Sequence, residues 1–158
     1  ETAVARFGGI DILVCNAGIS MRALFDNVQL DVLRRLMDVN FWGTVYCTKY
    51  ALPYLQAARG TVVGVSSVAG LHGLPGRTGY SASKYAMTGF LDTVRIENRR
   101  KGVHVMVAAI AKGIMRRKRL LLMEFEGRAT HFIKKFSPRF LDTMFYKVMA
   151  REPDSPFK

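Results

Sequence analysis

The sequence has few cysteines and no long apolar run, and both shortages exclude classes of protein. Its 158 residues contain two cysteines, Cys15 and Cys47, with no Cys-x-x-Cys and no pair of histidines at the spacing of metal ligands. We therefore expect neither a disulfide framework nor a metal site. The sequence shows no apolar run of about 18 residues and no signal peptide, so we expect a cytoplasmic protein.

Acidic residues are also scarce. The sequence has 12 of them and 24 basic residues, so its net charge is +12. Residues 112–158 carry 12 basic and 5 acidic groups. This basic C-terminal region has two interpretations. It is an element that contacts a membrane surface or a hydrophobic partner, or it is a helix with a solvated basic face, then a strand and two short amphipathic helices around Ser137-Pro138. We favour the second, because charge runs are usually solvated faces. No nucleic-acid recognition module is visible, so we expect no nucleic-acid partner.

Apolar runs alternate with helical patterns along the chain. The composition, 49% apolar and 23% charged, is that of a globular domain with one core. Short runs rich in β-branched residues predict strands, and apolar residues at three- and four-residue steps predict helices. The alternation of the two indicates a parallel α/β sheet. The predicted strands are 10–15, 61–66, 103–110 and 120–125, and the predicted helices are 1–7, 31–57, 80–100 and 110–119.

Tyr80 and Lys84 are four residues apart in a predicted helix, so their side chains share a face. A free tyrosine has a pKa of about 10, and lowering it to about 7 requires roughly 4 kcal/mol. An ammonium at about 4 Å supplies an interaction of that order at an effective dielectric near 20. Tyr80 is therefore a candidate general acid–base, and Ser67 could orient the same substrate oxygen. Taken alone, the pair is more often a half-buried tyrosine and a solvated lysine.

Further motifs accompany the pair, and together they resemble the short-chain dehydrogenase/reductase family. Four residues stand at separations of 27, 13 and 4, as in the family's catalytic tetrad, and an Asn-Ala-Gly follows the first predicted strand. The resemblance covers residues 1 to about 109 closely. It implies a Rossmann-like, doubly wound parallel sheet with three α/β/α layers, and a single domain over residues 1–158. The matching positions are Asn16-Ala17-Gly18, Asn40, Ser67, Tyr80 and Lys84.

The resemblance assigns a role to each residue of the tetrad. Tyr80 exchanges the proton, while Lys84 lowers its pKa and holds the nicotinamide ribose. Ser67 orients the substrate oxygen. Asn40 distorts its helix, which frees a carbonyl to hold a water that links Lys84 to solvent.

The resemblance also implies a nicotinamide cofactor. Asn16 is expected to steady the centre of the sheet, and the backbone of Ala17 and Gly18 leaves room for the cofactor, which Tyr80 and Lys84 also contact. We expect NAD or NADP, with NADP slightly preferred.

Two segments of the family pattern are missing. There is no Thr-Gly-x-x-x-Gly-x-Gly loop with its first βαβαβ half, and no Pro-Gly turn with a substrate-covering segment after Ala109. We therefore expect a partial domain, with missing segments before Glu1 and around residues 109–110. The residue that distinguishes NAD from NADP would lie before Glu1.

The predicted function is hydride transfer between NAD or NADP and a small-molecule carbonyl or secondary alcohol. The alternative is a catalytically inactive binding or scaffold protein that keeps the fold but lacks a complete cofactor site. The resemblance further implies a homodimer or homotetramer. An aromatic stripe in the helix predicted over 31–57 is core or a subunit contact. Its members are Phe41, Trp42, Tyr46, Tyr50 and Tyr54.

The three histidines are scattered along the sequence. A satisfied or solvated side chain is the expected state of each. His72 stands apart because it follows Ser67 in the glycine-rich loop before Tyr80. We expect His72, Leu74 and the loop near Arg77 to border the substrate, together with the missing segment after Ala109.

Overall fold

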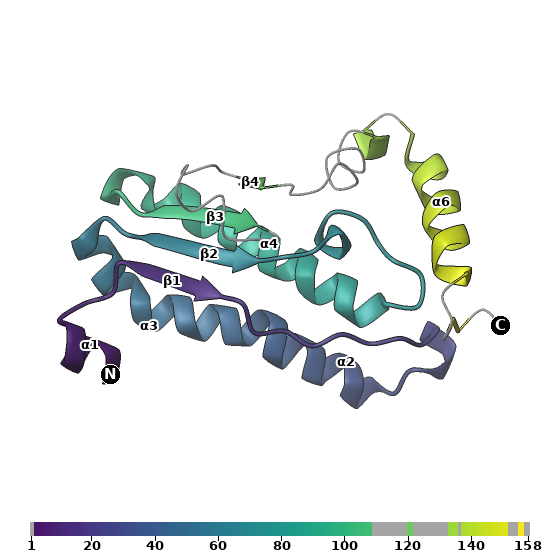
Figure 1. Cartoon of the computed structure of the whole chain (residues 1–158), viewed down its shortest axis with the longest axis horizontal. Coiled ribbons are helices and arrows are strands. Elements are labelled where there is room, and N and C mark those ends of the chain that lie inside the picture. The colour runs from purple at the N-terminus through teal and green to yellow at the C-terminus, as the bar shows by residue number, and fades with distance from the viewer. Residues whose placement is uncertain (1, 109–119, 122–132, 136, 152–154, 157–158) are drawn as a thin grey trace.

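Helices and short strands alternate along the chain in a computed structural model (Figure 1), which describes residues 2–108, 120–121, 133–135, 137–151 and 155–156. The strands are β1 (Ile12–Cys15), β2 (Thr61–Val65), β3 (His104–Ala108) and β4 (Leu120–Leu121). The α-helices are α1 (Thr2–Phe7), α2 (Leu30–Met37), α3 (Gly43–Ala58), α4 (Thr78–Asn98) and α6 (Pro138–Ala150). Three short 3₁₀ turns cover Phe25–Asn27, Val68–Gly70 and Arg99–Lys101.

The four strands form one parallel sheet in the order β1-β2-β3-β4. Cys15 lies beside Gly64, and Gly64 lies beside Val107, so the carboxyl ends of the first three strands meet at one edge. The predicted parallel α/β fold is confirmed. The predicted helix 110–119 and the rest of the predicted strand 120–125 lie outside the described residues.

The hydrophobic core lies between the sheet and the pair α3 and α4. Its centre combines Leu55 of α3 and Leu91 of α4 with Val62 and Val105 of the strands. A Cβ added at Gly64 would lie 2.2 Å from Cδ1 of Leu91, so only glycine lets α4 approach β2 this closely.

The opposite face of β1 is open in the described part of the chain. Ile12 and Val14 remain 51% and 48% exposed there. The second helix layer of the predicted three-layer arrangement is therefore not formed over β1 by the described residues.

The helix predicted over residues 31–57 is interrupted at Asn40. Between α2 and α3, residues Asp38–Trp42 form a π-helical turn, and the Gly43 amide donates to the carbonyl of Asp38, five residues back. The expectation of one regular helix is wrong at this turn, whereas the expected distortion at Asn40 is present. Such π turns inside α-helices are frequent at functional sites.

Most of the aromatic stripe is on the surface. Trp42, Tyr46, Tyr50 and Tyr54 recur at four-residue steps and are 40–76% exposed. Trp42 and Tyr46 stack with ring centroids 5.7 Å apart. The core interpretation is wrong for these four residues, and the subunit contact stays a prediction.

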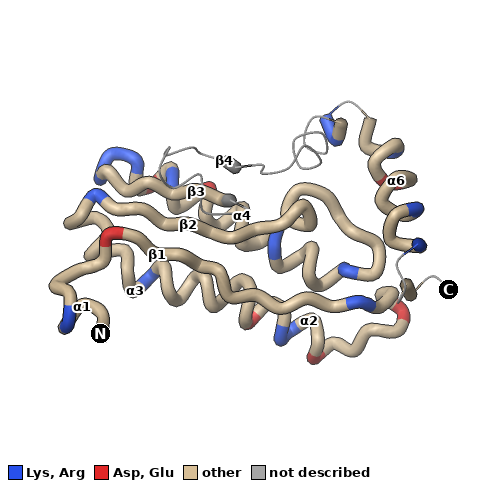
Figure 2. Tube along the Cα trace, viewed as in Figure 1, with Lys and Arg blue, Asp and Glu red and all other residues tan. Residues whose placement is uncertain are grey.

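Within the part of the chain that the structure describes, lysine and arginine positions occur on every α-helix and on none of the strands (Figure 2). Much of the basic C-terminal region, including residues 112–119, lies outside the described residues. Among the helices that the structure describes, none combines the length and apolarity needed to cross a membrane.

Candidate active site

Lys84 is a buried cation at the carboxyl edge of the sheet. Its side chain extends from α4, is 4% exposed, and donates a 2.9 Å hydrogen bond from Nζ to the carbonyl of Val65, the last residue of β2. Loss of hydration lowers the pKa of Lys84 below its ordinary value. Nζ lies 5.8 Å from the centroid of the Tyr80 ring. The Lys84 ammonium therefore lies near the Tyr80 ring, as predicted.

Asn40 is fully buried, and its side chain makes three hydrogen bonds. Oδ1 accepts from the Ile19 amide at 2.8 Å, while Nδ2 donates to the Ile19 carbonyl and to Oγ of Ser83, both at 2.9 Å. These bonds tie the π turn to the segment after β1 and to α4. The Asn40 carbonyl accepts a 3.1 Å hydrogen bond from Oγ1 of Thr44. The water that the resemblance assigns to this carbonyl stays a prediction.

Gly18 brings the Asn-Ala-Gly turn into this cluster. A Cβ at Gly18 would lie 3.3 Å from Oδ1 of Asn40 and 3.4 Å from Nζ of Lys84, so the bare backbone faces both groups. Asn16, Ala17 and Gly18 are exposed after β1, at the sheet edge where open α/β folds bind ligands. This uncovered backbone beside a buried ammonium fits a nicotinamide cofactor.

Asn16 is exposed directly after β1, and its expected role in steadying the sheet stays a prediction.

Ser67 lies two residues beyond the carbonyl that Lys84 contacts. It precedes the 3₁₀ turn Val68–Gly70, and its Oγ accepts a 3.2 Å hydrogen bond from the Ala69 amide. A Cβ at Gly70 would lie 3.2 Å from the Lys84 carbonyl, so this turn packs directly on the α4 turn that carries Lys84. Ser67 and Lys84 therefore lie at the same edge of the sheet.

Ser83 is a site residue that the sequence did not reveal. Its side chain is fully buried, accepts from Asn40, and donates a 2.8 Å hydrogen bond to the Tyr80 carbonyl. Ser83 thereby connects the π turn to the first turns of α4. The Tyr-Ser-Ala-Ser-Lys segment contained the residue, but only the fold shows that Asn40, 43 residues earlier, is its partner.

The cluster holds a buried ammonium, a half-buried phenol and the Ser67 hydroxyl at one edge of a parallel sheet. The Ser67 oxygen accepts from a backbone amide, which leaves its own proton for a further acceptor. Such a set can exchange a proton with an alcohol or carbonyl oxygen.

A family model described as short chain dehydrogenase matches residues 1–119. The chain is 40% identical over 98 residues to 11-beta-hydroxysteroid dehydrogenase-like 4A of Arabidopsis thaliana, covering 61% of this chain and 33% of that protein. It is 44% identical over 98 residues to 11-beta-hydroxysteroid dehydrogenase A of Arachis hypogaea, covering 61% and 28%. The chain thus spans about a third of the length of these relatives.

Solved structures are similar in fold. A short-chain dehydrogenase from Streptomyces avermitilis has a TM-score of 0.78 at 20% identity, covering 93% of this chain and 73% of that chain. An alcohol dehydrogenase from Thermococcus sibiricus, complexed with 5-hydroxy-NADP, has a TM-score of 0.65 at 24% identity, covering 68% and 45%.

Proposed function

The chain belongs to the short-chain dehydrogenase family, and on this premise we propose that it takes part in hydride transfer between a nicotinamide cofactor and a carbonyl or secondary alcohol. The observation that carries the proposal is the buried Lys84 ammonium, 5.8 Å from the Tyr80 ring and beside the bare backbone of Gly18. A buried cation is costly even when it donates a hydrogen bond, so its retention next to a phenol points to function.

In this proposal Tyr80 exchanges a proton with the substrate oxygen. It donates the proton when a carbonyl is reduced and takes it when an alcohol is oxidised. The Lys84 ammonium stabilises the phenolate that forms, and the hydrogen bond to the Val65 carbonyl fixes that ammonium at the edge of the sheet. The Ser67 hydroxyl donates to the same substrate oxygen and orients it. The nicotinamide supplies or accepts the hydride when it is bound.

The backbone of Asn16, Ala17 and Gly18, together with Tyr80 and Lys84, is proposed to contact the cofactor. NADP is the first candidate, because one structural neighbour is complexed with an NADP derivative. A hydroxysteroid is the first substrate class to test, because several relatives carry 11-beta-hydroxysteroid dehydrogenase in their names.

We also propose a cytoplasmic homodimer or homotetramer. The support for assembly is the exposed part of the aromatic stripe, which runs from the π turn along α3 and which a second copy would cover. Its exposed members are Trp42, Tyr46, Tyr50 and Tyr54.

The alternative is a binding protein that keeps this fold without turnover. Titration of the full chain with NADPH and NADH by fluorescence separates the two, since a scaffold without a cofactor site would bind neither.

Tyr80→Phe then tests the chemistry. It should abolish oxidation of an 11β-hydroxysteroid and leave cofactor binding mostly intact, because it removes only a hydroxyl and keeps the ring. Thr93→Val, which removes the hydroxyl of an exposed residue on the same helix, is the matched control and should change neither. Normal turnover by Tyr80→Phe would contradict the assignment.

A further inference from the structure

The loop between Ser67 and Tyr80 is held from one side by the segment after β1. Nη1 of Arg77 donates a 2.9 Å hydrogen bond to Oγ of Ser20, and the Ala23 amide donates to the Gly76 carbonyl at 3.0 Å. The loop contains several glycines, and Gly76 has a positive φ of 72°. A glycine-rich segment is conformationally permissive, so outside contacts must hold it in one conformation.

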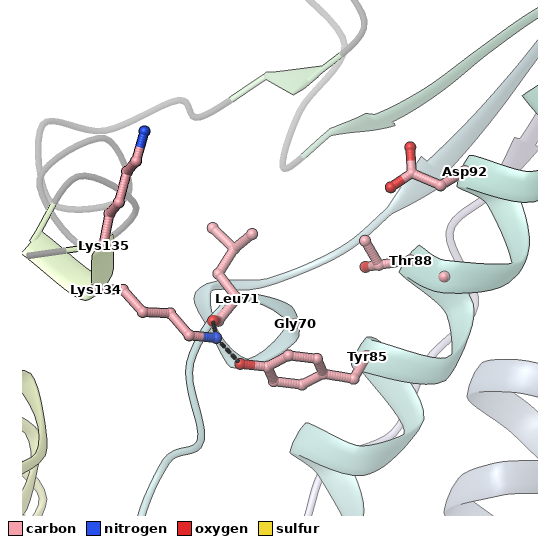
Figure 3. Close-up of a pocket in the computed structure, with 8 residues that line it drawn as sticks. Gly70, Leu71, Tyr85, Thr88, Asp92, Lys134 and Lys135 are labelled. Atoms are coloured by element: carbon pink, nitrogen blue, oxygen red, sulfur yellow. Dashed lines mark hydrogen bonds between the residues drawn. The ribbon is translucent and has the colours of Figure 1, made fainter. Parts of the chain in front are cut away.

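The C-terminal part of the chain holds the same loop from its other side. Its described pieces are residues 133–135, 137–151 and 155–156. We name them the C-terminal arm. In the first piece, Lys134 donates hydrogen bonds from Nζ to the Leu71 carbonyl and to the Tyr85 hydroxyl, the latter at 2.7 Å (Figure 3). The same ammonium lies 5.0 Å from the centroid of the Tyr85 ring. Lys134 thereby joins the loop to α4.

The second piece contacts His72, which is only 7% exposed. Nε2 of His72 lies 3.2 Å from Oδ1 of Asp142, and its ring stacks on Phe145 with centroids 5.0 Å apart and planes 25° apart. Both partners belong to α6, which Leu141 anchors with a fully buried side chain. The third piece contacts Gly76, where an added Cβ would lie 2.9 Å from Cγ of Pro156.

Apolar packing between the C-terminal arm and the loop is incomplete at Lys134. A solvent-open pocket of about 590 Å³ lies there, lined by Gly70 and Leu71 of the loop, by α4 and by Lys134 (Figure 3). Where apolar contact is interrupted by such a space, directed contacts determine the relative position of the two segments. At Leu71 these directed contacts are the hydrogen bonds of Lys134, and at His72 the pairing with Asp142 acts together with the stacked ring of Phe145.

We infer that the C-terminal arm sets the conformation of the loop between Ser67 and Tyr80, and that Lys134 and Asp142 are positioning residues for the substrate side of the site. The inference rests on the proposed function, because it concerns the residues that hold the substrate oxygen. Both ends of the loop carry proposed catalytic groups, so a displacement of the loop misplaces the substrate against Ser67. Displacement of the loop should therefore weaken substrate binding. Cofactor binding should not change, because Gly18 on the cofactor side contacts other elements.

Three variants of the full chain test this inference. Asp142→Ala removes the partner of His72, His72→Phe keeps an aromatic ring on Phe145 without the polar contact, and Lys134→Met removes both hydrogen bonds. Lys147→Ala, at an exposed position of α6, is the matched control. Hydrogen exchange of the amides of residues 68–77 should become at least about fivefold faster in the three variants, with β2 and β3 unchanged. It should not change in the control.

Kinetics distinguishes positioning from a general loss of structure. With an 11β-hydroxysteroid and NADP, KM for the steroid should rise about 5- to 20-fold, more than kcat falls, with unchanged NADPH affinity. The rise in KM of the double variant His72→Phe/Asp142→Ala should not exceed that of the more impaired single variant, because the two residues form one contact. Unchanged loop exchange, or an equal effect of Lys147→Ala, overturns the inference. A native chain that binds neither NADPH nor NADH overturns the proposed function instead, and loop exchange still decides the role of the arm.

Discussion

Asn40 donates a 2.9 Å hydrogen bond to Ser83, which in turn donates to the Tyr80 carbonyl. The pair links a π turn to the helix that carries the proposed proton donor, and both side chains are fully buried. A distortion in one helix and the position of a phenol on another therefore depend on one buried contact.

Ser83→Ala should destabilise the protein by about 1–3 kcal/mol, because it leaves one Nδ2 hydrogen of the buried Asn40 without its acceptor. Urea unfolding followed by circular dichroism measures this loss. Thr93→Ala is the control, since Thr93 is exposed on the same helix and bonds only to the Gly89 carbonyl one turn back. A stability equal to that of the native chain would show that Asn40 is satisfied without Ser83.

Gly18→Ala should weaken cofactor binding more than it weakens the fold. The new methyl group would lie 3.3 Å from Oδ1 of Asn40 and 3.4 Å from Nζ of Lys84, beside the ammonium that is proposed to contact the cofactor. We expect the Kd for NADPH to rise at least about tenfold, with a change in unfolding free energy of less than about 1 kcal/mol. Fluorescence titration and urea unfolding measure the two quantities.

Gly9→Ala is the control for Gly18→Ala, because a Cβ at Gly9 meets no atom within 4 Å. Equal NADPH affinity in the two variants would place the cofactor away from Gly18.

The sequence was sufficient to predict the positions of the strands and helices that have strong hydrophobic periodicity. The β-branched runs predicted β1, β2 and β3 to within two residues at each end that the structure describes, and α4 begins two residues before its predicted start. The separation of four residues correctly placed Lys84 near the Tyr80 ring.

Contacts between distant segments were not predictable in this way. The partner of Ser83 lies 43 residues away, and the partner of His72 lies in α6, 70 residues further on. Periodicity reports which face of a helix is apolar, but not which polar group will lie against it. The aromatic stripe shows the same limit, because its spacing of four is typical of a core face as well as of an exposed contact surface.

Gly64→Ala should destabilise the protein by about 1–3 kcal/mol through overpacking. Its Cβ would lie 2.2 Å from Cδ1 of Leu91, so α4 or the Leu91 side chain must shift. The variant Leu91→Val removes the conflicting methyl group and costs about 1 kcal/mol or more alone. The double variant should therefore be more stable than the sum of the two single losses implies. Strict additivity in thermal or urea unfolding would contradict this close approach of helix and strand.

Lys84→Met should change the pH dependence of stability, because it removes the buried ammonium and keeps the length of the side chain. Burial lowers the pKa of Lys84 in the folded state, so the unfolded chain binds this proton more tightly. The Lys84 contribution to the unfolding free energy therefore rises with pH between the lowered pKa and the ordinary value of about 10.4. We expect the stability of the variant relative to the native chain to be most favourable below this window and to decline through it. Urea unfolding of both proteins from about pH 6 to about pH 11 measures the difference. Lys49→Met, at an exposed position on α3, should show no such slope, and a flat difference for Lys84→Met would mean that the Lys84 ammonium remains hydrated.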